Sequence, residues 1–206
     1  MQQSAWLASA SFRIFAHGEP GSRSSAAALG RTHMRREGST LTVRSFAPDE
    51  WRLYRDVRLR ALQESPDAFG STYADEAQRF DGEWASRLSR GVSSPWDLPL
   101  VAEVSAEPCG LAWVRIAEDA PAIAHLYQMW VAPKRRRQGI GRALLDAAVA
   151  WARKAGAHTI VLDVTGGNHD AVRLYERAGF VPTGEPKPLR PGSTLQSQAM
   201  HLALED

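Results

Sequence analysis

The chain has 206 residues, of which 44% are hydrophobic and 23% charged, with a formal net charge of +2. This length allows one domain with a substantial core, and no apolar run approaches the roughly 20 residues of a membrane span. The single cysteine, Cys109, excludes an internal disulfide and a cysteine-based metal cluster. We therefore expect a protein of the reducing cytoplasm that has no membrane partner and no metal.

The basic residues are distributed unevenly. Residues 1–40 hold five arginines against two glutamates, so the other 166 residues carry 20 basic and 21 acidic groups, a balance of −1. A protein that binds nucleic acid along a duplex normally has a broad positive face. The sequence therefore favours a protein that does not bind nucleic acid.

Residues 1–40 are rich in Ser, Ala, Gly and Arg and show no sustained periodicity, which predicts a disordered extension before a domain over 41–206. The composition superficially resembles a transit peptide, but the segment lacks an amphipathic helix and an apolar core of the signal type. We favour the interpretation that Met34 is the true start and that the residues before it are an over-long reading frame.

Hydrophobic periodicity predicts six elements in the first part of the domain. They are a strand over 41–46, a helix from Pro48 to Leu62, a second helix over 73–88, and strands over 98–104, 110–116 and 123–131. The second helix places Phe80, Trp84 and Leu88 on one face, and residues 91–97 are predicted to be a loop. The turn over 105–108 predicts an antiparallel hairpin.

Five further elements are predicted after a glycine-rich turn. They are a helix over 142–154 capped by Gly156, a buried strand over 158–164, a short helix from Asn168 to Ala178, and strands over 181–184 and 197–204. A strand, a helix and a buried strand in succession imply a right-handed βαβ unit with parallel strands. The predicted fold class is α+β, an α/β/α sandwich whose mixed, mostly antiparallel sheet contains this parallel unit.

The glycine-rich turn itself predicts a pyrophosphate site. Gly139 and Gly141 allow the backbone to approach an anion, the following helix adds unsatisfied amides and its positive dipole end, and residues 134–137 add positive charges. ATP and NAD fit poorly, because the turn lacks the Lys-Ser/Thr pair of a nucleotide P-loop and the third glycine of a dinucleotide fingerprint. The alternative is a solvated basic loop.

The second informative segment runs from Asn168 to Phe180. Asn168 suits a helix N-cap and Gly179 suits the helix end, while Ala171, Leu174 and Tyr175 lie on one face. From the residues alone, Tyr175 is a core aromatic residue with a solvated hydroxyl.

Together the two segments resemble the GCN5-related N-acetyltransferases (GNAT). The turn Arg136-Arg137-Gln138-Gly139-Ile140-Gly141 matches the family pattern Arg/Gln-x-x-Gly-x-Gly/Ala, and the segment from Asn168 to Phe180 matches Asn-x-x-Ala-x-x-x-Tyr-x-x-x-Gly-Phe. The resemblance covers about residues 41–204. It implies the acyl-CoA N-acyltransferase fold and transfer of the acetyl group of acetyl-CoA to a primary amine of a small molecule or peptide.

The resemblance also assigns roles to residues. It implies that the acetyl-CoA site consists of Met129, Trp130, Val131, Arg136, Arg137, Gln138, Gly139, Ile140, Gly141, Arg142, Asn168 and Tyr175. The backbone of 129–131 would bind the pantetheine arm on a strand that splays from its neighbour, and the Tyr175 hydroxyl would face the thioester sulfur as the catalytic group. Dimerisation through the C-terminal strands is common in such folds and is a further possibility.

The reference pKa values limit what Tyr175 can do. A thiol titrates near 8.5 and a tyrosine near 10, so full proton transfer from Tyr175 to the departing thiolate is uphill by roughly 2 kcal/mol. Tyr175 is therefore expected to act partly as a hydrogen-bond donor to the developing charge.

One part of the family pattern is missing. Making an alkyl amine neutral at pH 7 costs about 4–5 kcal/mol, and many family members carry a glutamate on the splayed strand for this purpose. This chain has Gln128 there, which cannot accept a proton. Asp163, Glu103 or bound water remain candidates for the base. Without a base, the rival interpretation is a non-catalytic acyl-CoA sensor.

The variable acceptor-binding helices of the family correspond to the segment around 58–70. Arg58, Arg60 and Phe69 could line an acceptor site, or they could form a solvated face and a core plug.

Overall fold

The computed structural model describes residues 32–36 and 39–204, so the disorder predicted for residues 1–31 lies outside the described part. The strands form one sheet in the order β1-β2-β3-β4-β5-β6-β8-β7. Their bounds are β1 Thr32–Arg36, β2 Ser39–Ser45, β3 Asp97–Val104, β4 Glu107–Ile116, β5 Ile123–Val131, β6 Thr159–Thr165, β7 Val181–Pro188 and β8 Gln196–Ala203.

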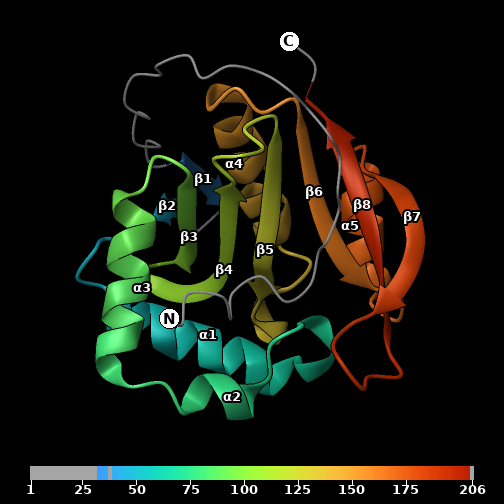
Figure 1. Ribbon diagram of the computed structural model, residues 1–206. Helices are drawn as coiled ribbons and strands as arrows, with labels where there is room; N and C mark the ends of the chain where they lie inside the picture. Colours follow the sequence, from blue (N-terminus) through green and yellow to red (C-terminus); the bar gives the residue numbers. More distant parts are fainter. Residues whose placement is uncertain (1–31, 37–38, 205–206) are drawn as a thin grey trace.

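Helices cover both faces of this sheet (Figure 1). They are α1 Trp51–Glu64, α2 Tyr73–Ala77, α3 Asp81–Ser93, α4 Ile140–Lys154 and α5 His169–Arg177. Helices α4 and α5 lie behind the sheet, and α1 to α3 lie on the near side, over the half of the sheet that includes β3 and β4. The predicted α/β/α sandwich is confirmed.

The sheet is mixed, as predicted. Strands β5 and β6 are parallel and joined through α4, whereas the other described pairs are antiparallel. This parallel βαβ unit contains the glycine-rich turn, because the turn connects β5 to α4. Within the described residues, no helix is long and apolar enough to cross a membrane.

Each face of the sheet carries its own core. On the α4 side, Leu144 and Leu145 pack among strand residues such as Ile160, while on the other side Tyr54 and Trp84 surround the centre of β4. Full burial of such side chains contributes about 1.5–3 kcal/mol each. The two cores hold α1 and α4 rigidly against opposite faces of β5, which lies between them.

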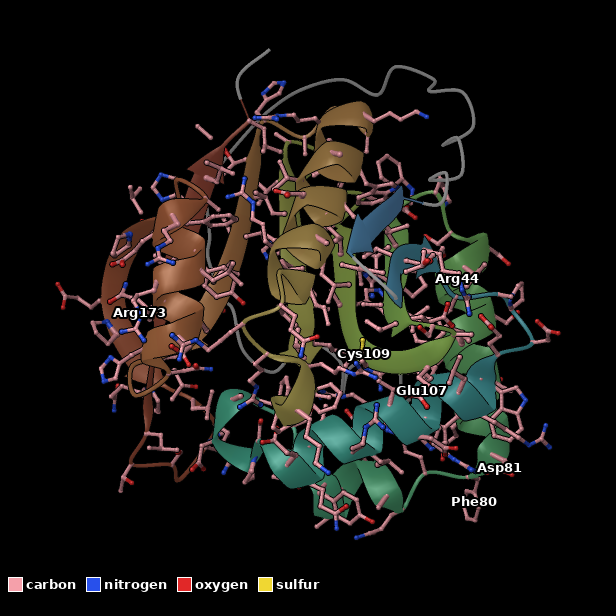
Figure 2. All side chains as sticks on the ribbon, turned by 180° about the vertical axis from the view of Figure 1, so that it is seen from behind. Arg44, Phe80, Asp81, Glu107, Cys109 and Arg173 are labelled. Atoms are coloured by element: carbon pink, nitrogen blue, oxygen red, sulfur yellow. The ribbon has the colours of Figure 1, made fainter. Side chains whose placement is uncertain are left out.

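The second predicted helix is two helices, and one of its residues was misplaced. Trp84 and Leu88 are buried as their spacing suggests, but Phe80 is 80% exposed and projects from the surface (Figure 2). The chain breaks after α2, and α3 restarts where the Phe80 N–H donates to the Glu83 carboxylate at 2.8 Å. A four-residue spacing cannot reveal such a restart, because it is compatible with one continuous helix.

Helix α3 also extends to Ser93, into residues that were predicted to be a loop. A Cβ atom on Gly91 would lie 2.2 Å from Trp113 Cζ2. The glycine therefore serves a close approach of α3 to β4 instead of ending the helix. Similarly, the β3–β4 hairpin turns on Ser105 and Ala106 alone, both with positive φ, so β4 starts at Glu107 and not at Gly110.

Residues 32–36 differ from the disorder expected for 1–40. They form β1, which pairs antiparallel with β2 from Thr32 opposite Val43 to Arg36 opposite Ser39. An edge strand is held by backbone hydrogen bonds to its neighbour, so it needs no hydrophobic periodicity of its own. A chain that began at Met34 would lack the first two residues of this strand.

Candidate active site

Strands β5 and β6 form a fork. Their parallel pairing covers only Ile123–Thr159, Ala124–Ile160 and His125–Val161, although β5 continues to Val131 and β6 to Thr165. Beyond His125 the two strands diverge (Figure 1). The facing backbone N–H and C=O groups of the fork are therefore left without strand partners, and backbone groups in this position require another partner.

A bulge in β5 shapes the fork. Tyr127 lies opposite Trp113 and Trp130 lies opposite Leu111, so two residues of β5 face one residue of β4. Gln128, within the bulge, has a φ of 56°. Its side-chain oxygen accepts a hydrogen bond from the Tyr54 hydroxyl at 3.1 Å, and burial raises the pKa of Tyr54, so this hydroxyl remains a donor. Gln128 is thereby bound to α1.

The glycine-rich turn lies at the open end of β5. Gly139 is the N-cap of α4 with a φ of 85°, and no described atom lies within 4 Å of the position that its Cβ would occupy. The N–H groups of the first turn, from Ile140 to Arg142, have no partner within the helix. This combination of open space, a left-handed glycine and free amides fits a phosphate group.

Gly141 lies where α5 comes close to α4. A Cβ there would lie 3.2 Å from Leu174 Cδ2, so the glycine permits close packing of α5 against α4. It positions the two helices relative to each other, whereas Gly139 provides the open space.

The polar side chains of the turn mostly brace it. Arg136 donates to the Val131 carbonyl at 3.0 Å, Gln138 donates to the Lys134 carbonyl at 3.1 Å, and Arg142 pairs with Asp146 at 2.7 Å. Arg137 is exposed and has a φ of 61°. Hydrogen bonds from Arg136 and Gln138 therefore hold the turn in shape. The Arg137 side chain is exposed to solvent.

Glu64, at the end of α1, was not recognised from the sequence. Its Oε2 atom accepts hydrogen bonds from Trp130 Nε1 at 2.9 Å and from Arg136 Nη2 at 2.7 Å. Burial alone would raise the pKa of Glu64, but hydrogen bonds from Ser65 and Trp130 and the charge of Arg136 hold it below its usual value. Glu64 thus connects α1, β5 and the glycine-rich turn, and no local sequence pattern indicates such a contact.

Helix α5 presents Tyr175 as the sequence predicts. Asn168 caps the helix by accepting from the Ala171 N–H at 3.2 Å, and Gly179 ends it with a φ of 92°. Tyr175 is 5% exposed and packs against Phe180, and its hydroxyl makes no hydrogen bond to the described residues. Burial raises the pKa of Tyr175, so the hydroxyl stays protonated throughout the neutral range.

The segment after α1 spans the mouth of the fork. Thr165, at the end of β6, donates to the Asp67 carbonyl at 2.7 Å, and Arg190 donates to the Phe69 carbonyl at 3.0 Å. Together with the Glu64–Trp130 contact, these bonds fix residues 64–69 to both arms of the fork.

Of the three residues considered for the acceptor site, two lie in the core. The Arg58 guanidinium stacks 4.6 Å above the Phe69 ring and lies 3.5 Å from Glu76 Oε1. Both side chains are buried, whereas Arg60 is exposed and donates to the Pro108 carbonyl.

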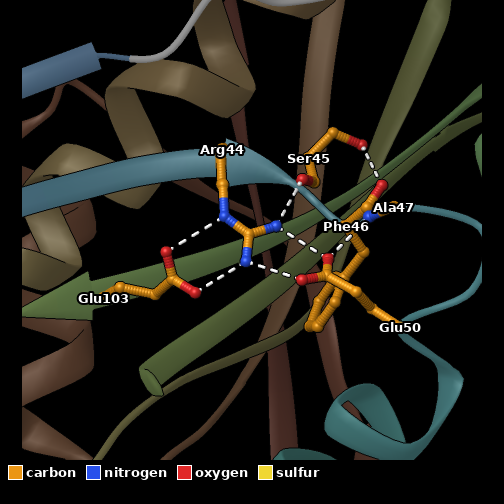
Figure 3. A network of polar contacts seen from close by, with 6 residues as sticks. All are labelled: Arg44, Ser45, Phe46, Ala47, Glu50 and Glu103. Carbon is orange, nitrogen blue, oxygen red and sulfur yellow. Dashed lines mark hydrogen bonds and ion pairs between the residues drawn. The ribbon is translucent and has the colours of Figure 1, made fainter. Parts of the chain in front are cut away.

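The structure separates the two acidic candidates for the base. Glu103 accepts two hydrogen bonds from Arg44, which also pairs with Glu50 (Figure 3). This network joins β2, β3 and the N-terminus of α1, and the Arg44 guanidinium contacts both oxygens of each carboxylate. Asp163 instead lies on β6 beside the fork, where partial desolvation by its neighbours raises its pKa and where Lys187 and His125 oppose that shift.

Comparison with known proteins agrees with this geometry. Residues 58–180 match the model of the acetyltransferase (GNAT) family. The chain belongs to this family. It is 33% identical over 186 residues to a mycothiol acetyltransferase of Thermobispora bispora, a match that covers 82% of the chain and 61% of that relative.

Solved structures show the same fold. A GNAT-family acetyltransferase from Streptococcus pneumoniae superposes with a TM-score of 0.68 at 22% identity, covering 80% of the chain and 99% of that protein. A putative acetyltransferase from Salmonella typhimurium with its cofactor acetyl-CoA superposes with a TM-score of 0.65 at 21% identity, covering 81% and 95%. The chain spans less than two thirds of the length of the curated relative. Membership of the GNAT family therefore applies to the matched domain alone.

Proposed function

We propose that the chain is an N-acetyltransferase that transfers the acetyl group of acetyl-CoA to a primary amine. The observation that carries the proposal is the fork, which opens beside the glycine-rich turn and leaves strand edges of β5 and β6 unpaired. A pantetheine arm is a chain with two amides, so it can pair with such an edge as a short strand would.

The residues of the site fit the parts of acetyl-CoA in order. The pyrophosphate would lie at Gly139 and the first amides of α4, and the backbone of 129–131 would pair with the pantetheine arm. Asn168, whose side-chain oxygen caps α5, would offer its amide to the same arm. The thioester then falls near the apex of the fork, within reach of Tyr175.

Tyr175 would donate a hydrogen bond to the sulfur as the thioester breaks. Because burial raises the pKa of Tyr175, complete proton transfer to a thiolate is even less favourable than the reference pKa values suggest. Its contribution is therefore a hydrogen bond to charge that develops in the transition state.

We expect Tyr175→Phe to lower kcat by about 100-fold, because the loss of one preorganised donor has an effect of this size. The ring remains in the core, so the melting temperature and the affinity for coenzyme A should be nearly unchanged. Thiol-release kinetics and calorimetric titration measure the two quantities. An unchanged kcat would remove Tyr175 from the chemistry.

The acceptor is proposed only as a class, a primary amine of a small molecule or a peptide, in the cytoplasm. The mycothiol acetyltransferase of Thermobispora bispora is 33% identical to this chain, but acceptor specificity depends on the loops around the site. A homodimer is compatible with this proposal.

A thermal-shift titration with acetyl-CoA, coenzyme A, ATP and NAD tests the donor. Stabilisation by the two coenzyme A species alone is expected, and a panel of amines with thiol-release detection then tests turnover. Binding of acetyl-CoA without thiol release to any amine would favour the rival acyl-CoA sensor. No stabilisation by coenzyme A would contradict both.

A further inference from the structure

A group of polar side chains lies on one face of the sheet at the apex of the fork. His125 is the last residue of β5 that pairs with β6, and the ring of Tyr127 stacks on it with centroids 5.8 Å apart and planes 8° from parallel. Asp163 lies on β6 two residues beyond Val161, the partner of His125. Since alternate residues of a strand share a face, His125, Tyr127 and Asp163 all project to the same side.

This side of the fork is the one from which an acceptor can approach. Helices α4 and α5 lie on the opposite side, where Leu126 and Leu162 are buried beneath them (Figure 1). Tyr127 is 42% exposed and Asp163 is exposed as well, so solvent reaches the apex from the polar side. A donor lying in the fork would therefore present one face to Tyr175 and the other to this group.

We propose that this face binds a protonated aliphatic amine, with Asp163 as its counter-ion and the His125 imidazole as the base that accepts its proton. The inference rests on the proposed function and names both the acceptor class and the missing base. It also accounts for Gln128, because a base three positions earlier on the same strand makes a glutamate at 128 unnecessary.

The protons and electrons balance. One N–H bond of the ammonium breaks and its proton passes to a ring nitrogen of His125, leaving a lone pair that attacks the thioester carbon. The C–S bond breaks, and the second proton of the nitrogen passes to the departing sulfur while Tyr175 donates a hydrogen bond to it. The products are the amide, free coenzyme A and an imidazolium that returns its proton to water.

The protonation state of His125 suits this role. Burial lowers the pKa of His125 and Asp163 opposes the shift, so the imidazole is neutral at pH 7 and can accept a proton. Other titratable or charged groups face the same region from the neighbouring strands. They are Asp97 on β3, Arg115 on β4, Tyr127 on β5, Lys187 on β7 and His201 on β8.

Two matched probes separate catalysis by a base from general damage. The probes are 2-phenylethylamine, which is protonated at pH 7, and its β,β-difluoro analogue, whose fluorines lower the amine pKa so that much of it is neutral. For His125→Gln we expect kcat/KM for the first probe to fall by about 100-fold or more at pH 7, with a much smaller loss for the second. Activity of the variant towards the first probe should then rise about tenfold per pH unit, as the neutral amine fraction does.

His201→Gln is the matched control, because His201 lies on the same face opposite Val161 but one strand away from the fork. We expect it to keep the wild-type ratio between the probes. Coenzyme A binding by His125→Gln, measured by thermal shift, should equal that of the wild type. If the wild type did not bind coenzyme A, the proposed function would be contradicted. This binding measurement therefore tests the proposed function separately from the role of His125 as the base.

Binding of the amine is tested without turnover. In calorimetry at pH 7, we expect the wild type to bind 2-phenylethylammonium more tightly than 2-phenylethanol. In Asp163→Asn, the ratio of the two dissociation constants should fall by about tenfold, because the counter-ion of the ammonium is lost. Equal losses of activity for both probes in His125→Gln, or equal binding of the ammonium and the alcohol by the wild type, would overturn the proposal.

Discussion

Gly139→Glu is expected to abolish coenzyme A binding while the fold remains intact. The side chain would start from a position with no described atom within 4 Å, directly before the free amides of α4. A carboxylate there would compete for the amides that the pyrophosphate needs and would repel its charge. We expect the dissociation constant for coenzyme A to rise by at least about 100-fold, equivalent to about 2.7 kcal/mol.

The positive φ of Gly139 requires a control for backbone strain. Gly139→Ala carries a Cβ in the same left-handed conformation without a charge, and we expect it to cost about 1 kcal/mol of stability and a modest part of the affinity. Calorimetric titration of both variants measures the difference. Equal affinities for the two variants would show that strain, and not charge, accounts for the loss, and wild-type affinity in Gly139→Glu would remove the pyrophosphate from this turn.

Glu76→Gln is expected to destabilise the fold by about 3 kcal/mol, because it removes the buried carboxylate that faces two buried guanidinium groups. Glu76 is 2% exposed and lies 2.9 Å from Arg87 and 3.5 Å from Arg58. The Nε and Nη1 atoms of Arg58 are already buried without a hydrogen-bond partner in the described structure, so little remains to compensate its charge. Chemical denaturation at pH 7 measures the loss.

The same contact predicts how stability depends on pH. Burial disfavours the ionised form of Glu76, but Arg87 and Arg58 together hold its pKa below the usual value. Its contribution is therefore complete above the unfolded-state pKa of about 4.3 and is lost as the pH falls through the lower pKa of the folded state. The stability difference between the wild type and Glu76→Gln should shrink below about pH 4.

Asp56→Asn is the matched control, since Asp56 is an exposed carboxylate of α1 beside Arg55. We expect a change within about 0.5 kcal/mol, as for other surface substitutions. A comparable loss of unfolding free energy in both variants would show that the buried Glu76 carboxylate stabilises the fold no more than an exposed carboxylate does.

The fold and the backbone features of the two motifs were readable from the sequence because they depend on local chemistry. Gly139, Asn168 and Gly179 each require a particular backbone geometry, and the structure has a left-handed glycine, a side-chain cap and a helix end at these positions. Such features are encoded within a few residues of each other. The strand between the two motifs, predicted to be buried on both faces, is β6, but only one of its faces is buried, because Asp163 on the other face is exposed.

The contacts around the mouth of the fork were not readable, because they join residues far apart in the chain. Glu64 meets Trp130 and Arg136, and Thr165 meets Asp67, although about 66 to 98 residues separate the partners. The same holds for Phe80, whose place depends on where α3 restarts. Periodicity reports which face a residue shares with its neighbours and carries no information about a distant partner.

By itself, the sequence determined the family and the order of the elements. It also determined the positions that need a left-handed glycine or a helix cap, which are Gly139, Asn168 and Gly179. What only the tertiary structure decided was where β5 and β6 separate, and hence that His125, Tyr127 and Asp163 share the open face at the apex. The physical reason is that the pairing of β5 with β6 ends where a bulge against β4 redirects the backbone of β5, while β6 stays paired with β8 on its other edge. That end point depends on the register of three strands at once, which no single segment specifies.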